Sequence, residues 1–230
     1  MKKNFLKKKI LFVLEKSKKK QIDYLFSKHL KKLQIHVVYK MLKRPENYRL
    51  IVLWNLKKII KKIPKINNVI VIHSSDLPKG RGWAPLYYAL ANNNLKHTIS
   101  AFLVSKHADR GDIIAKAKFS ISPLHTVETL RKVDAEICIM MIGLILKHFR
   151  GRLISGSKQK GKPTYFARRY PADSKININK ALVKIIPHLR GCGNEYPAFF
   201  NWRGYKFQLF LKAKSKPKFP TDLKIKFFDV

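Results

Sequence analysis

The chain has 230 residues, 46% of them hydrophobic, and 50 Lys and Arg against 13 Asp and Glu give it a formal net charge of +37. This size and hydrophobic content suit one α/β domain with a small appendage and exclude a second full domain. Such a charge is typical of proteins that bind nucleic acid or an anionic membrane surface, but Lys is spread through most of the chain, so a compositional bias explains it equally well.

Five apolar runs predict strands, and Lys-rich stretches with helical spacing separate them. The runs are 10–14, 35–39, 50–54, 69–72 and 98–104. This alternation is typical of a parallel sheet, so we predict an α/β fold with a Rossmann-like, doubly wound and mainly parallel sheet. After Gly156 the composition shifts to Pro, Tyr and Arg. We therefore predict a core over residues 1–156 and a C-terminal extension, a helix plus a β-hairpin, over 157–230.

Several helices and one hairpin follow from local signals. The expected helices are Leu56 to Ile63 ended by Pro64, Pro85 to Asn92, Thr126 to Phe149, and Asn179 to Leu189. The third has apolar residues at three- and four-residue steps and becomes fully apolar toward its end. Phe199 to Lys212 alternates aromatic and polar residues around Arg203-Gly204, which predicts a hairpin whose rings form its core. The rings expected in this core are Tyr196, Phe199, Phe200 and Trp202, with a base-stacking surface as the alternative.

The N-terminus superficially resembles a signal peptide, because basic residues precede the apolar run Ile10 to Leu14. That run is only five residues long and ends at Glu15 without a small-residue cleavage site, so a first strand is the better interpretation. The run 137–146 is too short to cross a bilayer, which takes about 20 apolar residues. Cys138 within it is predicted to be a buried, reduced thiol. We expect a cytoplasmic protein with no membrane span.

Two loops that follow predicted strands carry the residues most typical of a reactive site. The first begins at His73 and runs Ser-Ser-Asp-Leu-Pro-Lys-Gly-Arg-Gly to Gly82, and the second contains Asp109-Arg110-Gly111-Asp112. Open α/β sheets bind ligands beyond their strand ends, so His73 and Asp109 are expected in one cleft, within hydrogen-bond or one-water reach. Taken alone, each has a more ordinary interpretation as a loop residue. The Leu77-Pro78 bond is a candidate cis peptide.

These segments resemble the folate-dependent formyltransferase family, which includes methionyl-tRNA formyltransferase, glycinamide ribonucleotide formyltransferase and the sugar N-formyltransferases. The family pattern is Asn-x-His-x-Ser-hydrophobic-Leu-Pro-x-x-x-Gly at a strand end, followed later by Asp-x-Gly-Asp. The chain matches this pattern at His73, Ser75, Leu77, Pro78, Arg81, Gly82, Asp109, Gly111 and Asp112. Further on, Gln159 to Gly161, Tyr165 to Ser174 and the stretches around Leu189 and Tyr196 look like bacterial sugar-formyltransferase-like members.

The resemblance implies a role for each matching residue. His73 would donate to the oxyanion, and Asp109 would keep the imidazole charged and help to remove the amine proton. The formyl donor would be 10-formyltetrahydrofolate. It would be held at Trp54, Asn55, Arg110, Gly111 and Asp112. The acceptor would be bound by Ser75, Lys79, Arg81, Arg168 and Arg169. The last two arginines would contact phosphates, with a surface ion pair as the alternative.

One position departs from the family pattern. The catalytic Asn of the family stands two residues before the His, and that position is Val71 here. Side chains two apart share a strand face, so Val71 accompanies His73 but can donate no hydrogen bond. Losing one oxyanion donor typically costs about 3–4 kcal/mol in the transition state. Either another donor, with Asn55 as the candidate, replaces it or the activity is low.

Three functions compete. The leading prediction is formylation of a nucleotide-linked amino sugar, with a small-molecule partner and a homodimer as an option. Methionyl-tRNA formylation is the first rival, favoured by the charge, although nucleic acid is not the favoured partner. The second rival is a degenerate, non-catalytic family member that binds polyanions, for which Val71 is the best support. No His-Glu-x-x-His motif is present and the two Cys are far apart, so no metal site is predicted.

Overall fold

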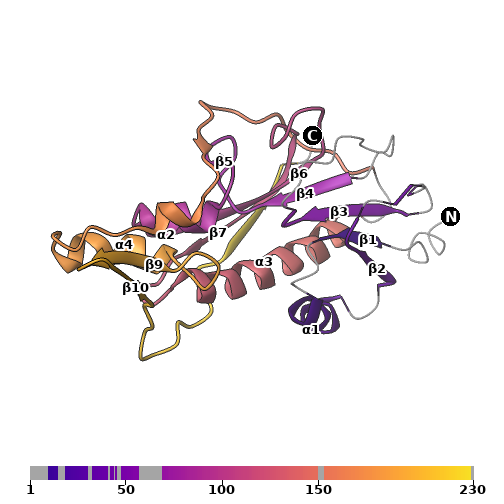
Figure 1. Cartoon of the computed structure of the whole chain (residues 1–230). Coiled ribbons are helices and arrows are strands. Elements are labelled where there is room, and N and C mark those ends of the chain that lie inside the picture. Colours follow the sequence, from indigo (N-terminus) through magenta and orange to yellow (C-terminus); the bar gives the residue numbers. More distant parts are fainter. Residues whose placement is uncertain are drawn as a thin grey trace.

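The computed structural model describes residues 10–14, 19–30, 33–40, 42–43, 45, 48–56, 69–149 and 153–228. Its centre is a seven-stranded sheet with the strand order β11-β7-β6-β4-β3-β1-β2. Helices pack against this sheet, and a small two-stranded hairpin projects from one end of the molecule (Figure 1). The predicted α/β class, with a sheet core and a helix-plus-hairpin extension, is confirmed.

One half of the sheet is parallel. It consists of β1 (Ile10–Val13), β2 (Ile35–Val38), β3 (Leu50–Trp54) and β4 (Val69–His73). All residues of β1 and β3 are buried, which explains why the sequence shows continuous apolar runs there rather than alternation. The four strands expected in this region are therefore confirmed, and the run at Ile10 is a strand of the core.

The other half of the sheet is antiparallel. β6 (Lys96–Leu103) runs against β4, β7 (Ile113–Ser120) against β6, and β11 (Lys224–Phe227) against β7. The expectation that the run 98–104 continues the parallel alternation is thus wrong. A strand's composition carries no information on its direction, and the connection through α2 returns the chain in the opposite sense. β11 belongs to the predicted extension yet completes the core sheet, while the proposed domain boundary stays a prediction.

Helices α1 (Lys19–His29) and α3 (Val127–His148) pack against each other on one face of the sheet (Figure 1). α3 matches the predicted helix, and its first turn is fastened by Thr126, whose backbone N–H donates to the Thr129 hydroxyl at 2.9 Å. Its apolar residues join those of the sheet in the largest hydrophobic cluster. α2 (Pro85–Ala91) also matches its prediction. The helix expected over 56–63 lies outside the described residues, except for Leu56.

The extension contains β8 (Tyr165–Phe166), a 3-10 turn (Pro171–Ser174) and α4 (Leu182–Gly191). β8 pairs with β5 (Arg81–Gly82), so backbone pairing joins the start of the extension to the loop that follows β4. α4 begins three residues later than predicted, because Asn177 to Lys180 form a turn. Its Arg190 is buried and donates to the carbonyls of Ser122 and His125, both at 2.9 Å. The extension is therefore anchored firmly on the core.

The hairpin of β9 (Ala198–Trp202) and β10 (Tyr205–Leu209) turns at Arg203-Gly204, as predicted. Residues paired across its strands share a face, which places aromatic and aliphatic side chains together. This aromatic face consists of Phe200, Trp202, Tyr205, Phe207 and Leu209. Trp202 is 49% exposed, so the prediction that it belongs to a hairpin core is wrong for this ring, whereas Tyr196, Phe199 and Phe200 are half-buried. Tyr205, on the same face as Trp202, is 71% exposed.

Candidate active site

The end of β4 delivers His73 to the site. Its Nε2 lies 2.9 Å from the carbonyl oxygen of Gly80, which can only accept, so Nε2 carries a proton and donates. The loop between them contains the cis Leu77–Pro78 peptide bond, as predicted. The Ser100 hydroxyl on β6 holds this loop, since it donates to the Ser75 carbonyl at 2.7 Å and receives the Leu77 N–H at 3.3 Å. The imidazole is thus fixed by the loop that follows it.

Asp109 reaches the site by another route than the one predicted. Because β6 is antiparallel to β4, the 104–112 loop starts beside Ile70, at the far end of β4 from His73. The loop nevertheless brings the Asp109 carboxylate to the Gly82 N–H, which donates to it at 3.0 Å. The Gln159 amide secures the loop by donating to the carbonyls of Asp109 and Gly111. A Cβ on Gly111 would lie 1.6 Å from the Leu103 carbonyl oxygen, so only glycine fits there.

His73 and Asp109 both line one cavity of about 500 Å³. No hydrogen bond joins the two side chains directly in the described part of the chain, and their contact through one water stays a prediction. One wall comes from the ends of β3 and β4 and from the 104–109 loop, and the other from α2, α3 and the extension. The lining residues are Leu53 to Leu56, Val71 to Ser74, Gly82 to Tyr87, Phe102, Val104 to Asp109, Val127, Arg131, Asp134, Ala135, Arg168, Arg169, Glu195 and Tyr196.

The structure brings only part of the predicted binding set to this cavity. Trp54, Asn55, Arg168 and Arg169 line it. Six further predicted residues are not among the lining residues, and their roles stay predictions: Ser75, Lys79, Arg81, Arg110, Gly111 and Asp112. Ser75 and Gly111 are buried, whereas Lys79 and Arg110 are exposed.

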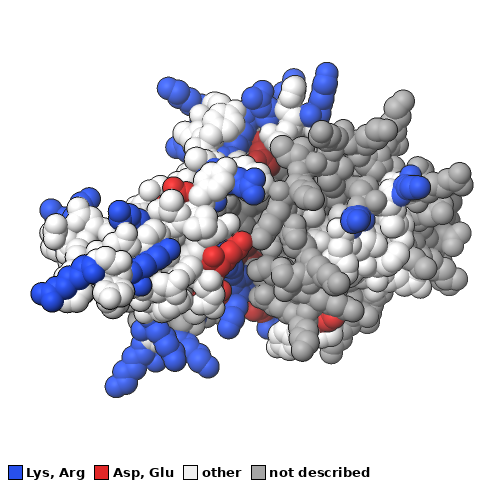
Figure 2. All heavy atoms as spheres, viewed as in Figure 1, with Lys and Arg blue, Asp and Glu red and all other residues white. Residues whose placement is uncertain are grey.

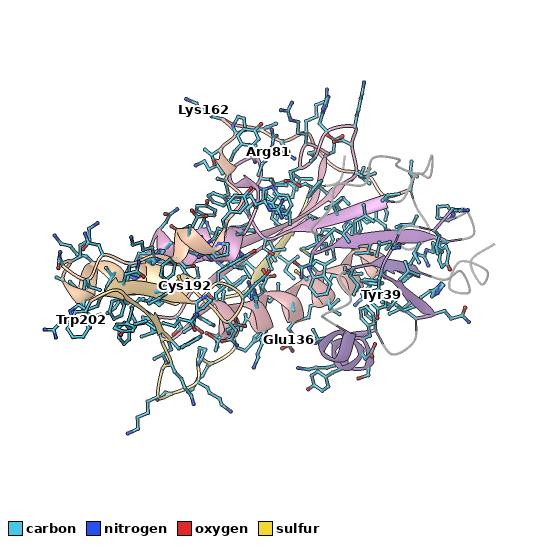
Figure 3. All side chains as sticks on the ribbon, viewed as in Figure 1. Tyr39, Arg81, Glu136, Lys162, Cys192 and Trp202 are labelled. Carbon is cyan, nitrogen blue, oxygen red and sulfur yellow. The ribbon has the colours of Figure 1, made fainter. Side chains whose placement is uncertain are left out.

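Arg81 holds the extension in place. It is buried and donates to the Gln159 side chain at 2.7 Å and to the Tyr165 hydroxyl at 3.3 Å. Arg110 also donates to Tyr165, and the hydrogen bond from Arg81 is the main reason that the pKa of Tyr165 is lowered. Figure 3 shows Arg81 and Lys162 at the upper edge of the molecule. These contacts tie the segment around Tyr165 to both loops of the site.

The two arginines of the extension lie among aromatic rings. Arg169 is 7% exposed, and its guanidinium carbon lies 3.6 Å from the ring centre of Tyr87. It donates to the Ser174 hydroxyl at 2.7 Å, while its Nε has no hydrogen-bond partner in the described part of the chain. Arg168 is exposed and lies 5.1 Å above the Trp83 ring. The cavity therefore holds two guanidinium groups that the described residues leave without a carboxylate.

No sequence motif singles out several of the lining residues on α2, α3 and the extension. Asp134 on α3 is a buried carboxylate, and the Ser74 hydroxyl donates to it at 2.9 Å. The Tyr87 hydroxyl oxygen lies 3.0 Å from Nδ1 of His188. Burial raises the pKa of this tyrosine. These residues are separated by long stretches of chain, so no motif links them. In the described residues, no group of three or more His, Cys, Asp or Glu is arranged to hold a metal ion.

Val71 takes the place expected from strand alternation. It lines the cavity together with His73, and it packs against Phe102 and neighbouring apolar residues of the sheet. Asn55 lines the same cavity from the end of β3, whose last paired residue, Trp54, lies opposite Ile72. Asn55 adopts a left-handed backbone conformation with φ 53°, which Asn tolerates better than most residues. A side-chain amide is therefore present at the site although position 71 provides none.

The family model described as "Formyl transferase" matches residues 15–138. The chain belongs to the formyl transferase family. This match includes both loops of the site, with His73 and Asp109. The resemblance inferred from the two motifs is therefore confirmed for the family as a whole.

Curated relatives match this chain over part of their own length. A methionyl-tRNA formyltransferase from Thermodesulfovibrio yellowstonii is 32% identical over 136 residues, which are 59% of this chain and 44% of the relative. The chain thus spans about half the length of the curated relatives it matches.

Among solved structures, a methionyl-tRNA formyltransferase from Clostridium thermocellum has a TM-score of 0.73 and 24% identity, over 96% of this chain and 99% of that chain. A sugar N-formyltransferase from Shewanella has a TM-score of 0.62 and 19% identity, over 90% and 98%. At these identities the two structures establish the shared fold.

Proposed function

We propose that the protein transfers a formyl group from 10-formyltetrahydrofolate to the amino group of a nucleotide-linked amino sugar, in the cytoplasm. The observation that carries this proposal is that His73 and Asp109, from two distant loops, line one cavity with Arg168 and Arg169 of the extension. The first pair suits acyl transfer to an amine, and the second pair suits a substrate that carries phosphates.

The His73 ring is oriented for this chemistry. Its Nε2–H donates to the Gly80 carbonyl, so Nδ1 is the nitrogen that gains or loses a proton. When protonated, Nδ1–H stabilises the negative oxygen that forms as the amine attacks the formyl carbon. Asp109 is held in the same cavity by the Gly82 N–H and supports the positively charged ring. This pair takes the proton that the amine loses and passes it to the folate nitrogen, whose bond to the formyl carbon breaks.

The wall formed by β3 and the 104–109 loop fits a folate. Leu53, Trp54 and Val104 give it an apolar lining for a flat ring, and the loop and Asn55 add polar groups that can bind the ring's edge. When bound there, the folate supplies the formyl carbon. Asn55 is the candidate second oxyanion donor, in the role that Val71 cannot fill.

The opposite wall supports an anionic acceptor. Arg168 and Arg169 have guanidinium groups that match phosphate oxygens in two-pronged contacts, and Trp83 and Tyr87 provide rings for stacking a base or a sugar. The Shewanella sugar N-formyltransferase shares the fold over 98% of its chain and the Clostridium methionyl-tRNA formyltransferase over 99%, so the choice of acceptor rests on these arginines and rings.

The test is incubation of the purified protein with 10-formyltetrahydrofolate and a panel of nucleotide-linked amino sugars, with mass detection of the N-formyl product. We expect product from at least one amino sugar, and none from His73→Ala. His36→Ala, outside the cavity on β2, serves as the matched control and keeps full turnover. Folate binding without turnover on any amine would support a degenerate member instead.

Methionyl-tRNA is the second candidate acceptor. The name of the Thermodesulfovibrio relative and the abundance of Lys and Arg on the described surface favour it (Figure 2). A ligand held by many phosphate contacts loses affinity with a logarithmic salt slope of about 0.7–0.9 per contact, whereas a nucleotide sugar gives a shallow slope. Tight, salt-sensitive binding of tRNA with formylation of its methionyl group would overturn the sugar proposal.

A further inference from the structure

Acidic side chains are concentrated at the cavity although they are scarce in the chain. Only 13 residues are Asp or Glu, and three of them line this cavity: Asp109, Asp134 and Glu195. Glu195 is exposed and lies 3.9 Å from Arg131. Asp134 differs from both other acids because it is 6% exposed. A buried carboxylate at the edge of a reaction site needs an explanation, since burying a charge is costly.

The contacts of Asp134 leave its charge without a full positive partner. Its Oδ2 accepts hydrogen bonds from the Ser74 hydroxyl at 2.9 Å and from the Cys138 thiol at 3.8 Å. Its Oδ1 lies 3.5 Å from Nε2 of the buried His97, too far for a well-formed hydrogen bond, and both atoms are otherwise without partners in the described part of the chain. Among the described residues no Lys or Arg forms an ion pair with Asp134. Arg131, one turn earlier on α3, pairs with Glu128 and Glu195 instead.

Asp134 shares the cavity with His73. Ser74, which holds it, directly follows His73 in the chain, and all three residues line the cavity. An ammonium group is a compact cation with three N–H donors, and a carboxylate beside a hydroxyl offers it acceptors of matching chemistry. The carboxylate thus belongs to the wall of the cavity that an amine must enter in order to meet His73.

We propose that Asp134, oriented by Ser74, binds the primary ammonium group of the acceptor, takes up the proton that this nitrogen must lose before it attacks, and selects amines over alcohols of the same shape. This inference rests on the proposed function, which it deepens by assigning the recognition of the reacting group. His97 backs the carboxylate from inside the fold, where it packs edge-on against Phe119. The nucleotide end of the acceptor remains with Arg168 and Arg169, so the two ends of one substrate are recognised by opposite charges.

The experiment compares a thymidine-diphosphate aminohexose with the hydroxyhexose that differs only at the reacting carbon, by calorimetry with tetrahydrofolate present. We expect the wild-type protein to bind the amine about tenfold more tightly or better. Asp134→Asn keeps the shape of the side chain and should remove this preference, with little change in affinity for the hydroxyhexose or for tetrahydrofolate. Glu136→Gln is the matched control on the same helix, because Glu136 pairs with Lys28 and lies outside the cavity (Figure 3).

The results distinguish failure of this inference from failure of the proposed function. The inference is overturned, but the proposed function is not, if Asp134→Asn still prefers the amine over the alcohol. The same holds if Asp134→Asn loses affinity equally for the aminohexose, the hydroxyhexose and tetrahydrofolate, which would indicate a purely structural role. Wild-type protein that binds no member of a panel of nucleotide-linked aminohexoses overturns the proposed function and the inference with it. If Asp134→Asn does not fold, Ser74→Ala provides the test, since it leaves the carboxylate but removes the hydroxyl that orients it. A reduced amine preference in Ser74→Ala supports the inference, and an unchanged preference contradicts it.

Discussion

At the scale of single residues, Asn55 and Val71 are the two positions that bear on oxyanion stabilisation in the proposed reaction. Both line the cavity, but only Asn55 has a side-chain donor. We expect Asn55→Gly to lower kcat by about 100-fold, the usual effect of losing one such donor. Glycine is chosen because it accepts the positive φ of this position without strain. Single-turnover kinetics with saturating folate and acceptor measure the effect.

The matched rescue variant is Val71→Asn in the Asn55→Gly background, which returns an amide to the strand face of His73. It should recover most of the lost rate. If Asn55→Gly turns over as fast as the wild-type protein, the donor is another group and the assignment of Asn55 fails.

Arg168 is the residue whose loss best tests phosphate recognition, because it is exposed and its removal leaves the core intact. We expect Arg168→Ala to raise KM for the nucleotide sugar about tenfold or more and to leave kcat nearly unchanged, as for a charged hydrogen bond made equally in substrate and transition state. Lys162→Ala removes another exposed cation of the extension, away from the cavity, and should change neither constant. Equal effects of both variants would indicate general attraction rather than a contact.

At the scale of elements, the sequence was informative where a pattern is local and silent where it depends on pairing. Strands β1 to β4, helices α2 and α3, and the turn at Arg203-Gly204 follow from apolar runs, periodicity and turn residues. The direction of β6 does not, because direction is set by the connection and not by the strand. Strands β5 and β8 have two residues each and no periodicity. In the site, His73 and Asp109 belong to motifs, whereas Asp134 reaches the cavity only through the packing of α3.

The junction between α4 and the core should weaken in acid. Burial lowers the pKa of His125 and of His188, so the folded protein favours both neutral rings more strongly than the unfolded chain does. The stabilisation is therefore complete above the usual His pKa of about 6.5 and is lost as the pH falls below it. Each extra proton bound by the unfolded chain costs at most about 1.4 kcal/mol per pH unit.

Thermal unfolding between pH 7.5 and 5 measures this dependence, with the replacement of both histidines by Gln as the comparison. The midpoint of the wild-type protein should drop more steeply with acid than that of the double variant. Parallel curves would show that other groups set the acid sensitivity. Cys192 beside His188 stays uncharged over this range, since burial raises the pKa of its thiol.

At the scale of the whole molecule, the positive net charge affects both substrate binding and self-association. A net charge of +37 attracts anionic substrates and repels other copies of the chain. Within the described residues, no helix is long and apolar enough to cross a membrane. Three of the 13 acidic residues line the cavity within this basic background, so the proposed substrate, with a phosphate end and an ammonium end, should orient itself before contact.

The exposed aromatic face of the β9–β10 hairpin predicts that the protein self-associates as salt is added. At low ionic strength the like charges hold two copies apart, but the screening length falls from about 10 Å at 0.1 M to about 3 Å at 1 M salt. The exposed rings of Trp202 and Tyr205 then become free to meet their counterparts. Light scattering should therefore report growth of particle mass as salt is added, the reverse of an assembly held by ion pairs. The double variant Trp202→Ser, Tyr205→Ser should stay monodisperse at high salt. The hairpin would then be a self-association surface that acts only when the charge repulsion is screened.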